Sequence, residues 1–176
     1  MAPVNLDGLF KTLVDLHDVT LDAHGIKLNL IRDYSAEPIV PGIEDRIVQV
    51  FRNLIGNAVS FSPDNASITL RVRIDDTQAV ITVEDEGPGL PPGTEESIFN
   101  RFYQERPESE KFGTHSGLGL SISQQIVEAH GGSIRAALDL GMMAAETLRA
   151  AGQIDAAMLV LRNQTRVVGD MPGQVT

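Results

Sequence analysis

The sequence predicts an α+β domain, because amphipathic helices and alternating strands follow one another along a single chain. Residues 6–24 and 44–59 repeat apolar side chains three and four positions apart, as helices do. Residues 68–74 alternate apolar and polar side chains, as in a half-buried strand, and residues 79–84 form the return strand of a hairpin. At 176 residues, with 42% hydrophobic residues, the chain is long enough for one compact domain with a core.

The first half of the chain is predicted to contain two helices and one short strand. The helix over residues 6–24 ends before a glycine, and residues 26–30 then alternate as a strand does. Residues 38–42 contain prolines and a glycine, so we expect a loop there. The second helix, over residues 44–59, ends before the turn-forming residues 62–65.

In the second half, a long loop separates the hairpin from a third helix. Residues 87–117 are rich in glycine, proline, serine and charge, and an irregular segment of this length is typically functional, such as a lid. Residues 118–130 resume helical spacing, and residues 133–136 form a short strand. Beyond them we expect a helix over residues 143–151 and an apolar run over residues 157–161.

Composition excludes several classes of function. The formal net charge of −10 gives no basic surface for nucleic acid and little attraction to an anionic membrane, so a bound phosphate must be held locally. The absence of cysteine excludes disulfides, thiolate metal sites and a cysteine nucleophile. No signal-peptide pattern opens the sequence and no apolar run approaches a membrane span, so we expect a soluble chain.

Two asparagines on the second helix are candidate ligands for a metal ion. Asn53 and Asn57 are four residues apart at the border of the apolar stripe, so both can face one cleft. Amide oxygens suit a hard cation such as Mg2+, which keeps several waters and shares its other ligands with substrate phosphates. A single asparagine at such a border is more often solvated or hydrogen-bonded locally.

The end of the hairpin supplies a carboxylate beside two glycines. Asp85 has the same strand parity as Ile81 and Val83, so its carboxylate should point to the buried side. A buried carboxylate needs hydrogen-bond donors, and the exocyclic amine of a purine is such a donor. Gly87 and Gly89 allow the backbone to approach a flat ring closely, although this spacing alone is more often a turn.

Glycines before the third helix form a candidate phosphate cradle. Free N–H groups and the positive end of the dipole at a helix start hold phosphate. No strand leads directly into these glycines and no third glycine follows at the required spacing, so we reject a dinucleotide-binding fingerprint. The residues predicted to contact the nucleotide here are Gly113, Thr114, Ser116, Gly117, Leu118 and Gly119.

Aromatic residues and one arginine lie in the long loop. Phe99, Phe102 and Phe112 are predicted to be apolar anchors that seat a lid, and Phe102 is also predicted to border the nucleotide. Arg101 lies between two of these anchors and could reach a terminal phosphate. A solvated loop arginine is an equally good interpretation.

In order along the chain, these blocks resemble the N, G1, F and G2 boxes of the ATP-binding catalytic domain of sensor histidine kinases. The same superfamily contains gyrase, MutL and the large ATP-dependent chaperones. The segments that resemble the boxes are residues 53–58, 85–89, 98–103 and 116–122, and residues 126–132 resemble the segment that follows the G2 box. The resemblance covers roughly residues 4–136, and four ordered blocks are far more specific than one.

The resemblance implies a two-layer α/β sandwich of the Bergerat type, with a mixed sheet covered on one face by helices. It implies ATP and Mg2+ as cofactors, with Asn57 as the metal ligand, Asn53 near the phosphates and Asp85 as the adenine reader. The glycines of the G1 and G2 boxes would form the phosphate cradle. Asn53 and Arg101 are the predicted catalytic residues.

One position distinguishes classes within the superfamily. The hydrolases, and the related anti-sigma serine kinases, carry a glutamate four residues before the metal-binding asparagine, where the hydrolases use it to activate water. This chain has Asn53 at that position. Without a carboxylate base, water attack is disfavoured and transfer to an external nucleophile is favoured.

The sequence departs from the family pattern at three places. Ser60 stands where many members have a phosphate-contacting lysine, and His115 where many have glycine. We therefore assign residues 1–136 to the catalytic ATP-binding domain and residues 137–176 to an atypical C-terminal tail. The tail lacks the expected closing strand with an apolar-proline ending, so residues 158–161 could replace that strand, or the tail could pack elsewhere, mediate dimerisation or be disordered.

The phosphoacceptor histidine of the family is not found in this sequence. His17 has an acidic neighbour but lacks the basic residue and proline that follow the family's phosphoacceptor, and His24 and His130 are interpreted as residues near helix C-termini, where a cation suits the dipole. The expected partners are the histidine-bearing dimerisation domain of the same or a partner kinase and a downstream response regulator. Nucleic acid and insertion of this fragment in a membrane are not expected.

The resulting prediction is a protein histidine kinase domain that transfers the γ-phosphoryl of ATP to a histidine on another domain. We expect a cytoplasmic location, with membrane anchoring of the parent protein and the oligomeric state left open. The alternative is a nucleotide-binding or partner-docking module without phosphotransfer. A self-contained ATPase is disfavoured by Asn53.

Overall fold

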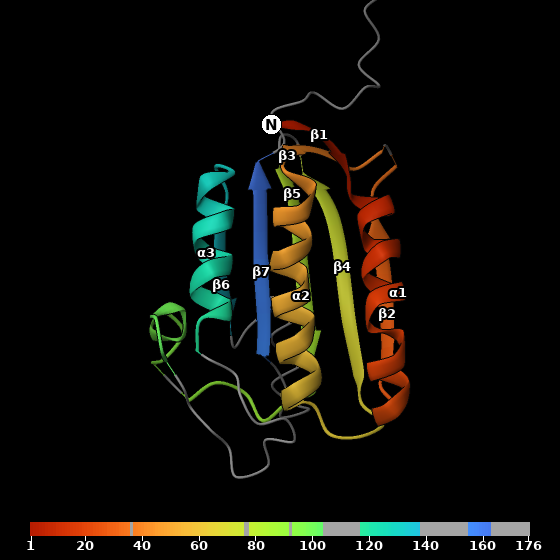
Figure 1. Ribbon diagram of the computed structural model, residues 1–176, viewed down its shortest axis with the longest axis vertical. Coiled ribbons are helices and arrows are strands. Elements are labelled where there is room, and N and C mark those ends of the chain that lie inside the picture. Colours follow the sequence, from red (N-terminus) through yellow and green to blue (C-terminus); the bar gives the residue numbers. More distant parts are fainter. Residues whose placement is uncertain (36, 76–77, 92, 104–116, 138–154, 163–176) are drawn as a thin grey trace, which may run out of the picture.

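The structure is a two-layer α/β sandwich in which helices cover one face of a sheet (Figure 1). It is a computed structural model that describes residues 1–35, 37–75, 78–91, 93–103, 117–137 and 155–162. The helices are α1 (Leu6–His24), α2 (Glu44–Phe61), α3 (Gly119–Ala129) and the 3₁₀ turn η1 (Ser97–Phe99). The strands are β1 (Ala2–Asn5), β2 (Lys27–Asp33), β3 (Ile39–Gly42), β4 (Ser67–Asp75), β5 (Gln78–Asp85), β6 (Ser133–Ala137) and β7 (Asp155–Arg162).

The main sheet is mixed, as the sequence predicts. Its strand order is β2-β4-β5-β7-β6, in which β2 is parallel to β4 and the other neighbours are antiparallel. The predicted hairpin is confirmed, with Leu70 opposite Val83 in β4 and β5. Helices α1, α2 and α3 lie side by side on one face of this sheet (Figure 1).

Strand β7 lies between β5 and β6 in the main sheet. It pairs with β5 on one side and with β6 on the other, with Leu159 opposite both Ile81 and Ile134. Of the alternatives for the C-terminal segment, the structure therefore has residues 158–161 as a sheet strand. The helix predicted over residues 143–151 lies outside the described residues.

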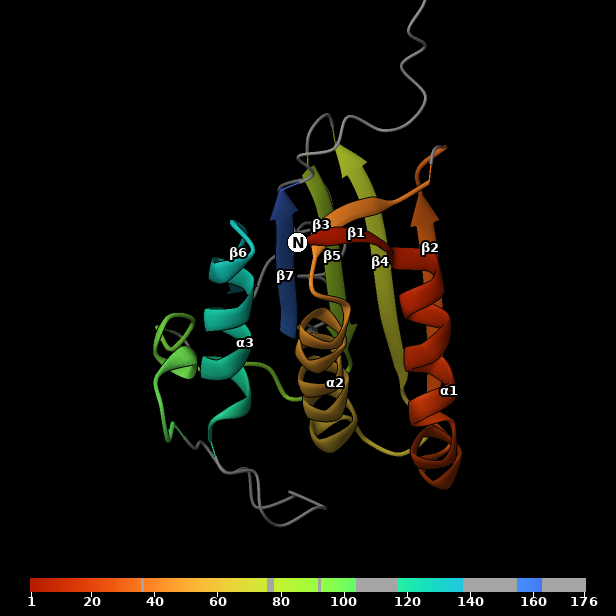
Figure 2. The ribbon, with the colours of Figure 1, turned by 45° about the horizontal axis from the view of Figure 1, so that its top comes forward.

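The loop predicted over residues 38–42 is wrong, because most of it forms β3. Strand β3 pairs antiparallel with β1, and Pro3 lies opposite Pro41. In a two-stranded ribbon each strand has an outer edge, so a missing proline N–H need not break a ladder. Figure 2 shows this ribbon across the end of the domain at which α1 and α2 begin.

The core lies between the helices and the sheet. Phe10 of α1 and Phe51 of α2 are fully buried and meet edge to face, with ring centroids 5.3 Å apart. Alternate residues of the central strands, such as Ile68, Leu70 and Ile81, are also fully buried. Among the described residues, none of the helices is long and apolar enough to cross a membrane.

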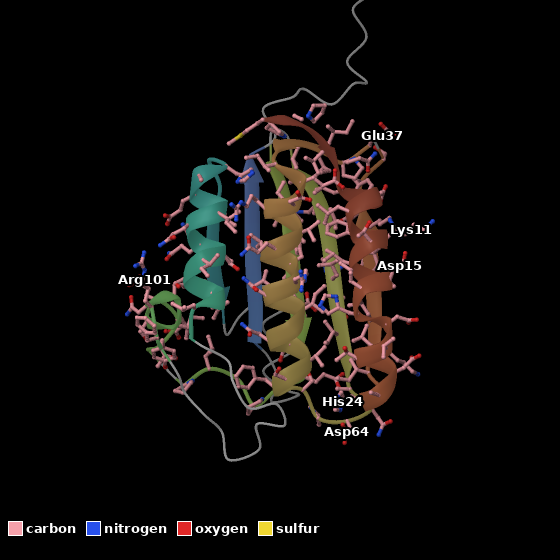
Figure 3. All side chains as sticks on the ribbon, viewed as in Figure 1. Lys11, Asp15, His24, Glu37, Asp64 and Arg101 are labelled. Atoms are coloured by element: carbon pink, nitrogen blue, oxygen red, sulfur yellow. The ribbon has the colours of Figure 1, made fainter. Side chains whose placement is uncertain are left out.

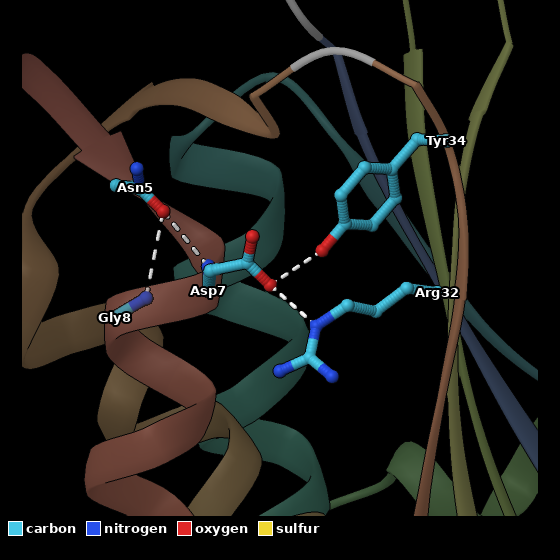
Figure 4. A network of polar contacts seen from close by, with 5 residues as sticks. All are labelled: Asn5, Asp7, Gly8, Arg32 and Tyr34. Carbon is cyan, nitrogen blue, oxygen red and sulfur yellow. Dashed lines mark hydrogen bonds and ion pairs between the residues drawn. The ribbon is translucent and has the colours of Figure 1, made fainter.

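The start of α1 is fastened to β2 through a carboxylate (Figure 4). Asn5 caps the helix by accepting the N–H of Asp7 at 2.9 Å. Asp7 in turn accepts hydrogen bonds from the Tyr34 hydroxyl at 2.5 Å and from Arg32 Nε at 2.7 Å. Burial alone raises the pKa of Asp7, but these hydrogen bonds outweigh it, so its pKa lies below the ordinary value. Burial and then the bond to Asp7 raise the pKa of Tyr34 to about 12.

Candidate functional site

Asn53 and Asn57 lie in the C-terminal half of α2, one turn apart and both half-buried. The apolar positions between and around them, such as Leu54 and Ala58, pack into the core, which fixes the angle at which the two amides leave the helix. Both therefore lie at the border of the buried stripe, as the spacing predicts.

Asn53 joins α2 to the first turn of α3. Its Nδ2 donates to the carbonyl oxygen of Gly119 at 3.0 Å and to Ser123 Oγ at 3.1 Å. Ser123, which is fully buried, closes the triangle by donating its hydroxyl to the Gly119 carbonyl at 2.8 Å. Ser123 has no signal in the sequence except its position four residues after Gly119, which puts both on one helix face.

Asp85 ends β5 and folds back on its own loop. Its Oδ1 accepts the backbone N–H of Gly87 at 2.8 Å, and its side chain is half-buried on the parity of Ile81 and Val83. A Cβ at Gly87 would lie 2.7 Å from Asp85 Oδ1 and 3.2 Å from the Phe61 carbonyl oxygen. The loop after β5 therefore lies against the end of α2 and leaves no room for a side chain at residue 87.

The start of α3 offers amide groups. Leu118 is the N-cap residue and makes no side-chain capping hydrogen bond, while its carbonyl accepts the N–H of Ile122 at 2.9 Å. The first N–H groups of a helix have no partner within it, and the dipole favours an anion beside them. Because Asn53 contacts Gly119, these amides lie next to α2.

Gly117 begins this turn in a conformation that suits glycine. Its φ is +66°, and a Cβ there would lie 2.8 Å from the Tyr103 carbonyl oxygen. Its carbonyl accepts the N–H of Phe102 at 2.9 Å. The segment around η1 and the start of α3 are therefore in direct backbone contact.

The three phenylalanines predicted to anchor the lid differ in burial. Phe99 is buried, as predicted, and Ile98 beside it is buried too. Phe102 is wrong as an anchor, because its side chain is 71% exposed; its backbone has a φ of +64° and donates its N–H to the Gly117 carbonyl. Phe112 lies outside the described residues.

Arg101 is not brought beside the asparagines. It is exposed, and Figure 3 shows it on the outer side of α3, with that helix between it and α2. Gly89 lies in the loop after β5 with φ of +87°. The predicted contacts Gly113, Thr114 and Ser116, together with His115, lie outside the described residues.

Two serines at the end of α2 differ in their partners. Ser60 donates its hydroxyl to the Gly56 carbonyl at 2.9 Å, so it is directed along its own helix. Ser62 is also buried, but its Oγ has no hydrogen-bond partner among the described residues. A buried hydroxyl of this kind had no signal in the sequence beyond its place at the helix end.

His130 lies at the C-terminal end of α3, as the sequence predicts, but its contacts are not those of a cation beside the helix dipole. It is buried, and its Nε2 accepts the backbone N–H of Ile43 at 3.0 Å. The other ring nitrogen, Nδ1, lies 2.7 Å from the Ile126 carbonyl oxygen and so carries the proton. The network therefore assigns a neutral imidazole.

A metal ion at this site would depend on amide oxygens. Within the described part of the chain, no group of three or more histidine, aspartate or glutamate side chains is arranged to hold a metal. The half-buried amide of Asn57 is of the hard-oxygen type that Mg2+ accepts while it takes its other ligands from phosphate and water. The donor chemistry therefore fits magnesium bound together with a nucleotide.

A family model described as histidine kinase-, DNA gyrase B- and HSP90-like ATPase matches residues 42–155. The chain belongs to this family. The match spans α2, the loop after β5 and the start of α3, which carry the predicted site residues.

Curated proteins similar to this chain include sensor proteins and sensor histidine kinases. The sensor protein ChvG of Agrobacterium fabrum is 43% identical over 141 residues, which are 77% of this chain and 24% of the relative. The sensor histidine kinase WalK of Bacillus subtilis is 34% identical over 135 residues, covering 74% of this chain and 21% of the relative. The chain thus spans about a quarter of the length of the curated relatives it matches.

Solved structures share the family fold. The mycobacterial sensor histidine kinase MprB superposes with a TM-score of 0.74 at 25% identity, over 92% of this chain and 97% of that one. The catalytic domain of the histidine kinase ThkA gives a TM-score of 0.75 at 23% identity, over 92% and 95%. These likenesses confirm the predicted sandwich, with its mixed sheet and helices on one face.

Proposed function

We propose that this chain is the Mg·ATP-binding catalytic domain of a sensor histidine kinase and acts in the cytoplasm. It would deliver the γ-phosphoryl group to a histidine on a separate dimerisation domain, and a response regulator would act downstream. The observation that carries the proposal is that three segments lie against one another: α2 with Asn57, the end of β5 with Asp85, whose loop contacts Phe61 of α2, and the uncapped start of α3, which Asn53 of α2 contacts.

Each of these groups has a distinct task in the proposal. Magnesium, when bound, supplies positive charge that neutralises the phosphates, and Asn57 would hold it. Asp85 is already fixed by the Gly87 N–H, so its carboxylate is oriented to accept a hydrogen bond from the adenine amine. The N–H groups at the start of α3 bind phosphate oxygens, and they need no reorganisation because the helix already holds them.

Asn53 supports transfer over hydrolysis. Its amide donates Nδ2 to Gly119 and Ser123, and it carries no carboxylate that could take a proton from water. In the superfamily, hydrolases have a glutamate at this position. Phosphoryl transfer through a loose transition state relies on positioning and charge neutralisation, so a catalytic domain without a base can serve an external nucleophile.

Nucleotide binding is tested by calorimetric titration with a non-hydrolysable ATP analogue, with and without Mg2+. We expect binding that tightens with magnesium, and we expect the Asn57→Ala variant to lose that dependence. Asn29→Ala, at an exposed asparagine on β2, is the matched control and should bind as the unaltered chain does. Magnesium-dependent binding that survives in Asn57→Ala would remove Asn57 from the metal site.

Phosphotransfer is tested with a dimerisation domain from a sensor kinase and γ-labelled ATP. The expected product is acid-labile, base-stable label on the histidine of that domain, formed only when this chain is present. Steady phosphate release by the chain alone would instead support a self-contained ATPase.

Ser60 favours a second candidate function, a nucleotide-binding module without transfer. Its hydroxyl is directed to the Gly56 carbonyl, so the cationic contact that a lysine would make with phosphate is missing at residue 60. Tight nucleotide binding without any labelling of the partner histidine would favour this module over the kinase.

A further inference from the structure

We propose that His130 is a positioning residue for the nucleotide site, acting by holding α2 in place against α3. This inference rests on the proposed function of the same site. His130 lies at the opposite end of α3 from the predicted phosphate cradle, so it would act through the two helices and would not touch the nucleotide.

Among the described residues, polar contacts connect α2 and α3 at two places, one at each end of their common length: two hydrogen bonds from Asn53 and one at His130. Asn53 donates to the Gly119 carbonyl where α3 begins, and the Ile43 N–H donates to His130 Nε2 where α3 has ended. The helices therefore run antiparallel. Along each helix the two contacts are separated by about 15 Å, at the helical rise of about 1.5 Å per residue, so the same span is fixed on both partners.

The contact at His130 is directional and tightly enclosed. Ile43 is the N-cap residue of α2 and has no side chain that could make a capping hydrogen bond. The imidazole ring provides the acceptor for the Ile43 N–H and uses its other nitrogen to donate to Ile126. A Cβ at Gly42 would lie 3.2 Å from His130 Cδ2, so the ring packs directly on the backbone where β3 ends.

This arrangement bears on the site because the predicted ligands are divided between the two helices. Asn57 belongs to α2, and the amides expected to bind phosphate belong to α3. Sliding or rotation of one helix against the other would separate the metal ligand from the phosphate cradle. Two hydrogen bonds far apart resist rotation better than one, because a single contact acts as a pivot.

The test compares three variants of the complete chain. His130→Gln keeps an acceptor near the position of Nε2, His130→Asn is too short to reach Ile43, and His130→Leu removes both polar contacts. His17→Leu is the matched control, because His17 Nδ1 also bonds to a carbonyl four residues earlier, Leu13, on α1. All variants are measured at a temperature well below their thermal unfolding midpoints, so that each is fully folded.

The first readout is affinity for the Mg2+ complex of a non-hydrolysable ATP analogue. We expect His130→Leu and His130→Asn to bind about fivefold or more weakly, the size of a modest coupling between distant sites. We expect His130→Gln and His17→Leu to stay within about twofold of the unaltered chain, on the same scale. Unchanged affinity in folded His130→Asn, or equal loss in His130→Gln, would overturn the proposal.

The second readout does not depend on nucleotide. The side-chain amide resonance of Asn53, followed by 15N NMR, should shift in His130→Leu or His130→Asn and stay in place in His17→Leu. A purely stabilising role of His130 would leave this distant amide unaffected in the folded variants. If the unaltered chain bound no nucleotide, the proposed function would fail, whereas the Asn53 resonance would still decide whether His130 sets the helix arrangement.

Discussion

Phe102 and Gly117 share one backbone hydrogen bond of 2.9 Å, and both have left-handed backbone angles, with φ of 64° and 66°. A left-handed phenylalanine is uncommon and costs energy, whereas glycine adopts this conformation freely. The bond brings the end of the η1 segment to the residue that precedes Leu118, the N-cap of α3. The conformation of Gly117 is therefore decisive for how the chain enters the candidate phosphate cradle.

We predict that Gly117→Ala and Gly119→Ala have opposite effects on stability. At Gly117 the new Cβ would meet Tyr103 and Phe102 atoms at 2.8–2.9 Å and would be strained by the positive φ, costing about 2 kcal/mol. At Gly119 it would lie 3.6 Å from Asn53 Cγ, an ordinary contact, and alanine favours a helix by up to about 1 kcal/mol over glycine. Urea unfolding measures both; equal losses would contradict the difference.

The bridge from Asn53 predicts that Asn53→Asp is more destabilising than Asn53→Ala. Aspartate would place a carboxylate oxygen against the Gly119 carbonyl oxygen, where Nδ2 now donates at 3.0 Å. Losing this hydrogen bond and leaving two oxygens that repel each other should lower the free energy of unfolding by about 1–3 kcal/mol. Thermal unfolding of both variants tests this, with Asn29→Asp as an exposed control, and a milder effect of aspartate than of alanine would argue against the bridge.

We predict that replacing Ser62 by alanine stabilises the fold. Among the described residues Ser62 Oγ has no partner, so Ser62→Ala removes a buried polar group and should raise the free energy of unfolding by about 1 kcal/mol. Ser123→Ala should lower it by about 1 kcal/mol, because Ser123 donates to Gly119 and accepts from Asn53. Both are measured by denaturant unfolding. Loss of stability in Ser62→Ala would mean that the hydroxyl has a partner.

We predict that the charged Asp7 carboxylate stabilises the fold and that this stabilisation disappears in acid. Its folded pKa is lower than the ordinary value, so folding favours the charged carboxylate. The contribution is present above the unfolded pKa of about 4 and is lost as the pH falls through the lower folded value. The difference in unfolding free energy between the unaltered chain and Asp7→Asn should therefore shrink below about pH 4. A difference that grows in acid would have the wrong sign.

We predict that the neutral Tyr34 phenol stabilises the fold and that this stabilisation disappears in alkali. Its pKa is raised to about 12, so folding favours the neutral phenol, and the stabilisation is fully present below the unfolded pKa of about 10. It is lost as the pH rises through about 12. Ultraviolet titration should show a late phenol ionisation, and Tyr34→Phe should remove it. A late ionisation that persists in Tyr34→Phe would contradict the raised pKa of Tyr34.

Much of the fold could be predicted because the spacing of apolar residues along each segment indicates its secondary structure. The bounds of α1 and the β4–β5 hairpin follow from apolar spacing and turn residues, and the structure agrees within a few residues. The β1–β3 ribbon was missed because each strand has only four residues and its partner lies far away in the sequence. The prolines and glycine of residues 38–42 also favoured a loop there.

The site could be predicted as types of residue but not as a set of contacts. The spacing of Asn53 and Asn57 and the parity of Asp85 follow from helix and strand geometry. The bond from Asn53 to Ser123, the neutral state of His130 and the exposure of Phe102 depend on how distant segments pack, which no local pattern contains. These features therefore needed the folded structure.

The place of β7 in the sheet gives the order in which the domain can be completed during synthesis. Strand β6 is made before β7, yet β7 is the neighbour that connects it to β5. On the ribosome, α1 through β5 can pair as soon as they emerge, whereas β6 must wait until residues 155–162 have left the exit tunnel. A nascent chain paused before that point would carry every predicted nucleotide ligand on a sheet still missing two of its five strands.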